Sequence, residues 1–512
     1  MQKTSFGLRS LKNLDGFLIA VVGFLVILAY TRYNGIGISP DSIAYLSAAR
    51  NINSHGILAD YNFLPLVDFP VLYPIFLSIT GFITRIDPLL IAPYINGLLL
   101  AGIIIISGYL IDSFEGTNKW YKRIILLFLA VGPSLLEIYS MLWSETLFIF
   151  LTIVFIAAFS IYLRKHSVQS LIWCGVIAAL ACVTRYAGVT LIGTGLMLLV
   201  FDRSLTLRKR IIHCLWFGLV SISLLAANLL RNALITNSLT GPREKGILTL
   251  SDNIVFYGRV ICYWLPVHGD QPRLVSGVAI VIFIIIGLLF LKRSWLKRTY
   301  TTAENCFSAY FIVYTVFIIG ISTLSHFEQI NNRFISPAFV PMIIGLTSWI
   351  PKTLRSLHKT QFRMALVGLG IIAIVFERNQ LKEVNTMFAE VKDYGIAGYT
   401  DDSWKHSQTA KFLREHPDYF DRQYTVYSNA HEAAYFNGHL ATESLPHRVS
   451  KHDVDEFFSE DGLYLIWFDD FSDNELIKFR TIWDKCDVVK KYDFNDGDIF
   501  FIKPRHSSAQ PQ

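Results

Sequence analysis

A carboxylate, a tyrosine and an arginine follow the first apolar run of the chain at near-helical spacing. They are Asp41, Tyr45 and Arg50, in the segment 39–51. A carboxylate within hydrogen-bond reach of a hydroxyl can take its proton while the hydroxyl attacks an electrophile. An acidic residue just after Pro40 is also typical of the first turn of a helix. From spacing alone, a purely capping role for Ser39 or Asp41 explains the pattern equally well.

Basic residues near the ends of later apolar runs could hold an anionic group such as a phosphate. Arginine suits this role because its planar guanidinium binds phosphate oxygens bidentately and keeps its charge in apolar surroundings. The alternative is that each side chain only reaches from its helix end to the lipid headgroups. The candidates are Arg185, Arg231, Arg243, Lys245, Arg259 and Arg333.

Glu145 is an ionisable residue at the start of an apolar run. A charge near the membrane interior is costly and usually faces a cavity or a partner. We therefore interpret Glu145 as a contact to a substrate or to Arg185. The alternative is an acid at the membrane interface next to Trp143.

The composition of the chain predicts a polytopic membrane protein that positions these residues. The chain has 512 residues, of which 53% are hydrophobic, and its mean hydropathy is +0.42. Apolar runs of about 18–22 residues recur, each long enough to cross about 30 Å of hydrocarbon as a helix. We expect about 11 spans, at 14–33, 88–111, 123–139, 144–163, 169–184, 186–201, 210–230, 273–292, 303–323, 334–350 and 363–378.

Loop charge predicts the orientation of these spans. Short basic loops, such as that of Lys119, Lys122 and Arg123 and those at 203–210 and 352–363, alternate with longer loops of mixed composition, 34–87, 231–272 and 324–333. We expect the basic loops in the cytoplasm, together with an N-terminus that shows no signal-peptide cleavage site. The basic residues that give the chain its net charge of +6 then lie mainly in these loops. Because they are spread over short loops between apolar runs, they indicate no nucleic acid partner.

The apolar run at 70–86 does not fit the alternation of loops. Counting it as a span would place every later basic loop outside. Pro70 and Pro74 also disfavour a long regular helix. We therefore expect a short helix at the outer membrane surface, the alternative being that it spans and a later run does not.

Residues 380–512 differ from residues 1–379, because they are charged and aromatic and contain no run long enough to span. Strand-like pieces such as 463–468 alternate with helix-like pieces such as 431–437, which predicts a small α/β domain. With an odd number of spans, this domain is extracytoplasmic. The expected fold is an all-α polytopic membrane domain with juxtamembrane helices in its first outer loop, 34–87, followed by the small α/β domain.

Short motifs occur in order along most of the chain. They are Asp41 with Tyr45, Phe69-Pro70 with Tyr73-Pro74, Trp143-Ser144-Glu145, Thr184-Arg185, Arg231-Asn232 with Gly241-Pro242, Arg333-Phe334 and Tyr427-Ser428-Asn429. This set resembles the GT-C glycosyltransferases. It is most similar to the family 39 group of protein-mannosyltransferase and aminoarabinose-transferase relatives.

The resemblance implies an inverting membrane glycosyltransferase, and nothing in the sequence requires a cofactor or a metal. In this family the donor is a hexose or pentose on a polyprenyl phosphate, and the acceptor here would be a lipid, a glycan or a protein. Carried over to this chain, Asp41 is the base that acts on the acceptor hydroxyl. Tyr45, Glu145 and the six basic residues above bind the substrates. Transfer would take place at the outer face of the cytoplasmic membrane.

The chain departs from the family pattern at two places. Ser42 follows Asp41 where many relatives have a second acid, and Asp68 to Val71 replace a His-Pro-Pro motif, so no histidine or metal contact is carried over. Two alternatives stay open. A surface-glycan polymerase or ligase differs mainly in its acceptor. A transporter or flippase for lipid-linked sugars needs charged residues along a path through the membrane, whereas here they gather at one face.

Overall fold

The computed structural model describes residues 14–505, without residues 115, 237, 241–245, 266, 268, 296–299, 326–327 and 472. The described residues form two compact units. The first unit comprises residues 14–32 and 66–390, and the second comprises residues 33–65 and 391–505. The segment after the first helix therefore packs with the far C-terminal part of the chain.

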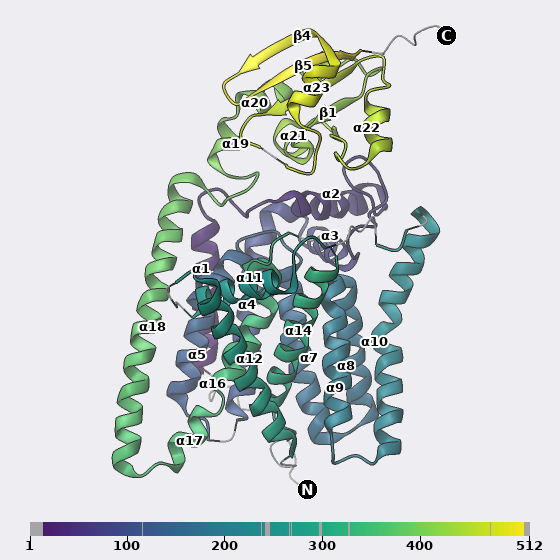
Figure 1. Ribbon diagram of the computed structural model, residues 1–512. Helices are drawn as coiled ribbons and strands as arrows, with labels where there is room; N and C mark the ends of the chain where they lie inside the picture. The colour runs from purple at the N-terminus through teal and green to yellow at the C-terminus, as the bar shows by residue number, and fades with distance from the viewer. Residues whose placement is uncertain are drawn as a thin grey trace. The chain divides into compact units, whose positions relative to one another are not determined.

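The first unit is helical, and its long helices run side by side in Figure 1. Its elements are α1 (Leu14–Thr31), α3 (Leu72–Thr84), α4 (Pro88–Asp112), α5 (Lys119–Val131), α6 (Pro133–Tyr139), α7 (Glu145–Lys165), α8 (Val168–Thr184), η2 (Tyr186–Gly188), α9 (Val189–Phe201), α10 (Leu207–Thr236), α11 (Leu250–Trp264), α12 (Pro272–Trp295), α14 (Ala303–Leu324), α15 (Asn332–Ile335), η3 (Ser336–Ala338), α16 (Phe339–Thr347), α17 (Ile350–Ser356) and α18 (Lys359–Tyr394).

Within the described residues, 8 helical segments are long and apolar enough to cross a membrane. Two further expected spans form the shorter apolar helices α8 and α9. The expected span 123–139 is divided between α5 and α6 at Pro133, which has no N–H to continue the first helix. These helices make the chain a multi-pass membrane protein.

The run at 70–86 forms α3, a helix of 13 residues. At 1.5 Å per residue it is about 20 Å long, which is shorter than the roughly 30 Å of a hydrocarbon core. This length favours the interpretation of a helix that does not cross the membrane by itself.

Lys122 shows how α1, α4 and α5 are joined. Its side chain is 2% exposed, and its Nζ atom lies 2.7 Å from Asp112 and 3.2 Å from Asp15. The two carboxylates offset the cost of burying the cation. The sequence places Lys122 in a solvated basic loop, whereas the structure uses it as a buried contact between helices.

The second unit combines a helix from the first loop with a small α/β sheet. Its elements are α2 (Pro40–His55), α19 (Asp402–His406), α20 (Gln408–Glu415), η4 (Pro417–Tyr419), β1 (Val426–Ser428), α21 (His431–Gly438), β2 (Glu443–Ser444), α22 (Lys451–Phe457), β3 (Leu463–Phe468), α23 (Phe479–Lys485), β4 (Cys486–Phe494) and β5 (Gly497–Pro504).

The five-stranded sheet has the order β2-β1-β3-β5-β4. Strand β1 is parallel to β2 and β3, and β5 is antiparallel to β3 and β4. Apolar side chains of β3 and β5, including Leu463, Leu465, Phe500 and Ile502, form the core with α22 and α23. The architecture is that of the predicted small α/β domain.

Candidate active site

Glu145 is the centre of a buried group of charges in the first unit. It is the first residue of α7, and its side chain is 1% exposed. Its Oε1 atom lies 2.8 Å from Nη1 of Arg185 and 2.6 Å from Nε of Arg333. Arg185 directly follows α8, and Arg333 lies in α15. Three segments far apart in the sequence thus meet at one carboxylate oxygen.

The residues before Glu145 complete this group. Ser144 is the N-cap of α7, and its Oγ accepts a hydrogen bond from Nη1 of Arg185 at 2.8 Å. The guanidinium carbon of Arg333 lies 4.5 Å from the centroid of the Trp143 ring, a cation–π contact. We call these five residues, Trp143, Ser144, Glu145, Arg185 and Arg333, the arginine cluster.

The arginine cluster has the chemistry of an anion site. A helix N-terminus favours negative charge, because its first N–H groups point outward. The two arginine side chains are 18% and 13% exposed, whereas Glu145 is closed off from solvent. Glu145 is therefore placed to orient the two guanidinium groups, which are the part of the cluster that solvent reaches.

The side chain of Asn332, the residue before Arg333, connects neighbouring helices of the first unit. Its Nδ2 donates to Glu137 Oε2 at 2.7 Å, and its Oδ1 accepts from Trp264 Nε1 at 2.7 Å and from Ser134 Oγ at 2.8 Å. One buried amide thus joins α6, α11 and α15. Its partner Glu137 did not stand out in the sequence, because it lies within a short apolar helix without a motif.

The other basic candidates lie outside this cluster. Nη1 of Arg231 donates to the carbonyl oxygen of Leu66 at 2.9 Å and to Asn232 at 3.1 Å, so Arg231 holds the backbone that precedes α3. Arg259 lies 3.9 Å from Asp270, and its side chain is 43% exposed. Arg243 and Lys245 lie outside the described residues.

Asp41 belongs to the second unit, as the second residue of α2. The N-cap of α2 is Ser39, whose backbone N–H donates to Ser42 Oγ at 3.0 Å. The capping bonds of α2 thus involve the serines on either side of Asp41, which is itself half-buried. Tyr45 is one turn further along, and it is 2% exposed.

An acid that the sequence did not single out lies near Asp41 in the second unit. Glu432 is the second residue of α21, and α21 packs against α2. Glu432 follows the Tyr427-Ser428-Asn429 motif by three residues, but the motif itself has a structural role. Asn429 joins β1 to the end of β3 through bonds to the backbone of Phe468 at 2.8 and 2.9 Å.

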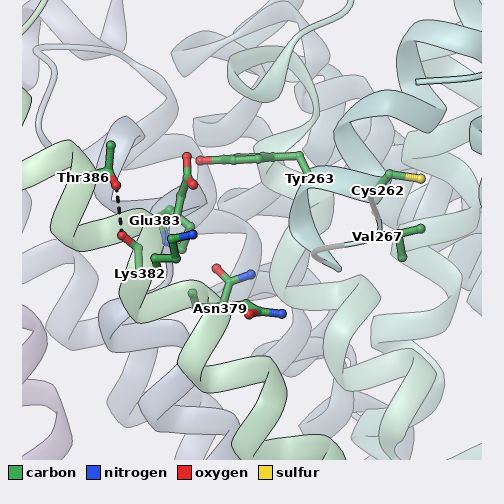
Figure 2. A pocket seen from close by; sticks show the side chains of 9 residues that line it. Cys262, Tyr263, Val267, Asn379, Lys382, Glu383 and Thr386 are labelled. Atoms are coloured by element: carbon green, nitrogen blue, oxygen red, sulfur yellow. Dashed lines mark hydrogen bonds between the residues drawn. The ribbon is translucent and has the colours of Figure 1, made fainter. Parts of the chain in front are cut away.

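Two pockets lie along α18 in the first unit. A polar pocket of about 290 Å³ is lined by α18 and by the end of α11, and in Figure 2 the side chains of Tyr263 and Glu383 point toward each other across it. An apolar groove of about 1070 Å³ lies between α18 and α5, where Trp120 and Ile124 line it. Lys382 lines both the polar pocket and the apolar groove, so the two adjoin along α18.

No protein-family model and no curated protein matches the chain. Solved structures do. ArnT from Cupriavidus metallidurans, bound to undecaprenyl phosphate, matches with a TM-score of 0.56 and 12% identity, covering 97% of this chain and 99% of that one. The archaeal oligosaccharyltransferase AglB from Archaeoglobus fulgidus, in complex with an inhibitory peptide and a dolichol-phosphate, matches with a TM-score of 0.55 and 10% identity. That match covers 89% of this chain and 70% of AglB.

These likenesses extend over both the helical part and the C-terminal part of the chain. At such low identity they concern the arrangement of helices and strands, which is the arrangement that the sequence motifs predict. The chain therefore has the fold of the GT-C glycosyltransferases.

Proposed function

We propose that the chain is an inverting membrane glycosyltransferase that moves a sugar from a polyprenyl phosphate to a hydroxyl acceptor at the outer face of the cytoplasmic membrane. The observation that carries the proposal is the arginine cluster, a pair of partly exposed guanidinium groups held by a buried carboxylate at a helix N-terminus in a chain of this fold. ArnT and AglB were each solved with a polyprenyl phosphate bound, and a phosphate is the group that such a cluster fits.

The proposed reaction needs one base and one phosphate site. Asp41 takes the proton of the acceptor hydroxyl as its oxygen forms a bond to the anomeric carbon. The bond from the anomeric carbon to the phosphate oxygen breaks, and its electron pair stays on that oxygen. Arg185 and Arg333 stabilise the charge that develops there. A single displacement of this kind inverts the anomeric centre.

The donor also needs a place for its prenyl chain. The apolar groove between α5 and α18 offers a surface of suitable chemistry on the membrane-embedded unit. Pro133 lines the polar pocket beside this groove, and the next residue, Ser134, bonds Asn332 beside Arg333. The groove and the arginine cluster are thus linked through α6 and α15.

The test is a mass-spectrometric comparison of surface glycans, lipids and glycoproteins from cells with and without the chain. A transferase yields a sugar-modified product that is lost with the chain. Longer glycan chains as the only change would favour the polymerase alternative. Movement of the lipid-linked sugar across the membrane without a new product would favour a transporter and overturn the proposal.

The variant Asp41→Asn tests the base. Loss of a general base lowers transfer by about 100- to 10,000-fold, while expression and folding stay as in the wild type. Asp453→Asn is the matched control, because Asp453 also lies in the first turn of a helix of the second unit and is 56% exposed. Full activity of Asp41→Asn would exclude Asp41 as the base.

A further inference from the structure

Two helices of the second unit carry an acid at the same position, and they pack against each other. Asp41 is the second residue of α2, and Glu432 is the second residue of α21. The two helices are far apart in the sequence. The C-terminal part of the chain therefore brings a second acidic residue on the helix that packs against the one carrying the proposed base.

Several contacts hold the first-loop segment against α21. The rings of Tyr61 and Tyr435 stack with their centroids 4.4 Å apart. The backbone N–H of Tyr399 donates to the carbonyl oxygen of Ile38 at 2.8 Å, just before α2 begins. Asn437, in α21, donates to the carbonyl oxygen of Tyr399 at 3.1 Å. The contacts of Tyr399 and of the Tyr61–Tyr435 pair thus hold the segments before and after α2 against α21 within one packed unit.

The Glu432 carboxyl lies in a polar recess of this unit. Its side chain is 19% exposed, and Oε1 lies 3.2 Å from Nε2 of His431. Tyr399 is 3% exposed, and its hydroxyl lies within hydrogen-bonding reach of the Glu432 carboxyl. Tyr399 therefore connects the backbone just before α2 to the side chain of Glu432.

Burial and neighbouring negative charges raise the pKa of Glu432 into the physiological pH range. Burial, followed by the negative charges of Asp41 and Asp473, raises the pKa of Glu432 to about 7. Burial lowers the pKa of His431 to about 4, against the opposing charges of Glu443 and Asp60, so this histidine is neutral at pH 7. The titratable groups that face Glu432 and His431 are Asp41, Asp60, Tyr61, Tyr399, Glu443 and Asp473.

We propose that Glu432 is the proton-accepting partner of Asp41. The inference rests on the proposed function. Asp41 takes the proton from the acceptor hydroxyl and passes it to the Glu432 carboxylate, directly or across one bridging water. Glu432 then releases the proton to solvent, and Asp41 is ionised again for the next turnover. Glu432 acts through Asp41 and does not contact the substrate.

This relay predicts a pH signature that a purely structural role does not have. Glu432 can accept a proton only when it is ionised. The wild-type rate should therefore rise with pH through the titration of Glu432, and Glu432→Gln should lack that rise. A glutamate that only supports the fold would change the rate by the same factor at every pH.

The kinetic test compares kcat, measured at saturating donor and acceptor, of the wild type and of Glu432→Gln from pH 6 to pH 8, with the donor and acceptor identified by mass spectrometry. At pH 8 we expect the variant to be about 10-fold slower, a smaller loss than the 100-fold or more of a general base itself. At pH 6 the two rates should converge. Glu415→Gln is the control, because Glu415 is 56% exposed and pairs only with the neighbouring Lys411 on α20 among the ion pairs of the described residues. A constant ratio across this range, or no loss at pH 8, would overturn the relay.

A second test needs no substrate. Infrared absorption of protonated carboxyl groups in the purified full-length protein should include a contribution that titrates near pH 7 and is lost in Glu432→Gln. In Asp41→Asn this titration should move to lower pH, because the charge of Asp41 raises the pKa of Glu432. An unmoved titration would overturn the coupling. If the coupling is present but the wild type transfers no sugar, the proposed function fails and the coupling stands.

Discussion

Nε of Arg333 donates to Oε1 of Glu145 at 2.6 Å, across 188 residues of sequence. The same oxygen is 2.8 Å from Arg185. The Glu145 carboxylate is fully buried, so its oxygens meet protein groups and not solvent. Because both guanidinium groups contact the same oxygen, the carboxylate fixes their orientation. This relationship makes Glu145 the structural anchor of the proposed phosphate site.

Glu145→Gln should destabilise the protein. It should also increase the rise in melting temperature that a bound phosphate causes. Removing one member of a buried ion pair costs about 3–5 kcal/mol, so thermal unfolding followed by tryptophan fluorescence should begin at lower temperature. A bound phosphate can replace the missing negative charge. Added undecaprenyl phosphate should therefore raise the melting temperature of Glu145→Gln more than that of the wild type, because a ligand stabilises the state that it binds. Equal shifts in both proteins would contradict a phosphate site at these arginines.

Arg333→Lys keeps the positive charge but removes the planar fork and its contact with the Trp143 ring. A hydrogen bond to a charged group is worth about 1.5–3 kcal/mol, so the Kd for undecaprenyl phosphate should rise by about 10- to 100-fold. Native mass spectrometry of the full-length protein measures this Kd. Arg259→Lys is the matched control, since Arg259 is 43% exposed and lies outside the cluster. A similar loss in both variants would mean that binding depends on general charge rather than on this site.

The sequence predicted the elements with strong periodicity. Strand β3 has the predicted bounds 463–468, and the predicted helix 431–437 forms α21, which ends one residue later at Gly438. Strand β2 was not predicted, since two residues carry no alternation that a pattern could reveal.

The candidate site was only partly predictable. Motif positions singled out Glu145, Arg185 and Arg333, and the structure brings these three together. The contact of both arginines with one Glu145 oxygen depends on how α7, α8 and α15 pack. A local sequence pattern does not predict that packing. Glu432 was missed for the same reason, because its importance comes from a helix nearly 400 residues away in sequence. Lys122 looked like a loop charge, since burial of its ammonium becomes visible only with Asp15 and Asp112 in place.

The raised pKa of Glu432 predicts a pH dependence of stability. The folded protein binds this proton more tightly than the unfolded chain does, so stability falls as pH rises from 4.5, the ordinary pKa, through about 7. Above that range the penalty is about 3 kcal/mol. Glu432→Gln carries no such penalty, so it should be more stable than the wild type at pH 8, and the difference should vanish near pH 4.

Urea unfolding of the second unit, followed by the fluorescence of its tryptophans, measures this difference at pH 5 and pH 8. Glu415→Gln should follow the wild type, because its carboxylate is 56% exposed. A wild type that gains stability relative to Glu432→Gln as the pH rises would show that the folded protein favours the ionised carboxylate, contrary to the burial and the charges described here.

The stacked rings of Tyr61 and Tyr435 should couple the first-loop segment to α21. Their planes lie within 18° of each other, and aromatic pairs contribute about 0.5–1.5 kcal/mol beyond their burial. In a double-mutant cycle, Tyr61→Ala and Tyr435→Ala should therefore cost less together than the sum of the single changes. Hydrogen exchange of the α2 amides measures each cost, because release of the segment exposes that helix. Tyr424, which packs on Phe501 with centroids 4.9 Å apart, serves as control, and Tyr61→Ala with Tyr424→Ala should be additive. Additive costs for Tyr61 and Tyr435 as well would mean that other contacts, such as that of Tyr399 with Ile38, hold α2 in the second unit.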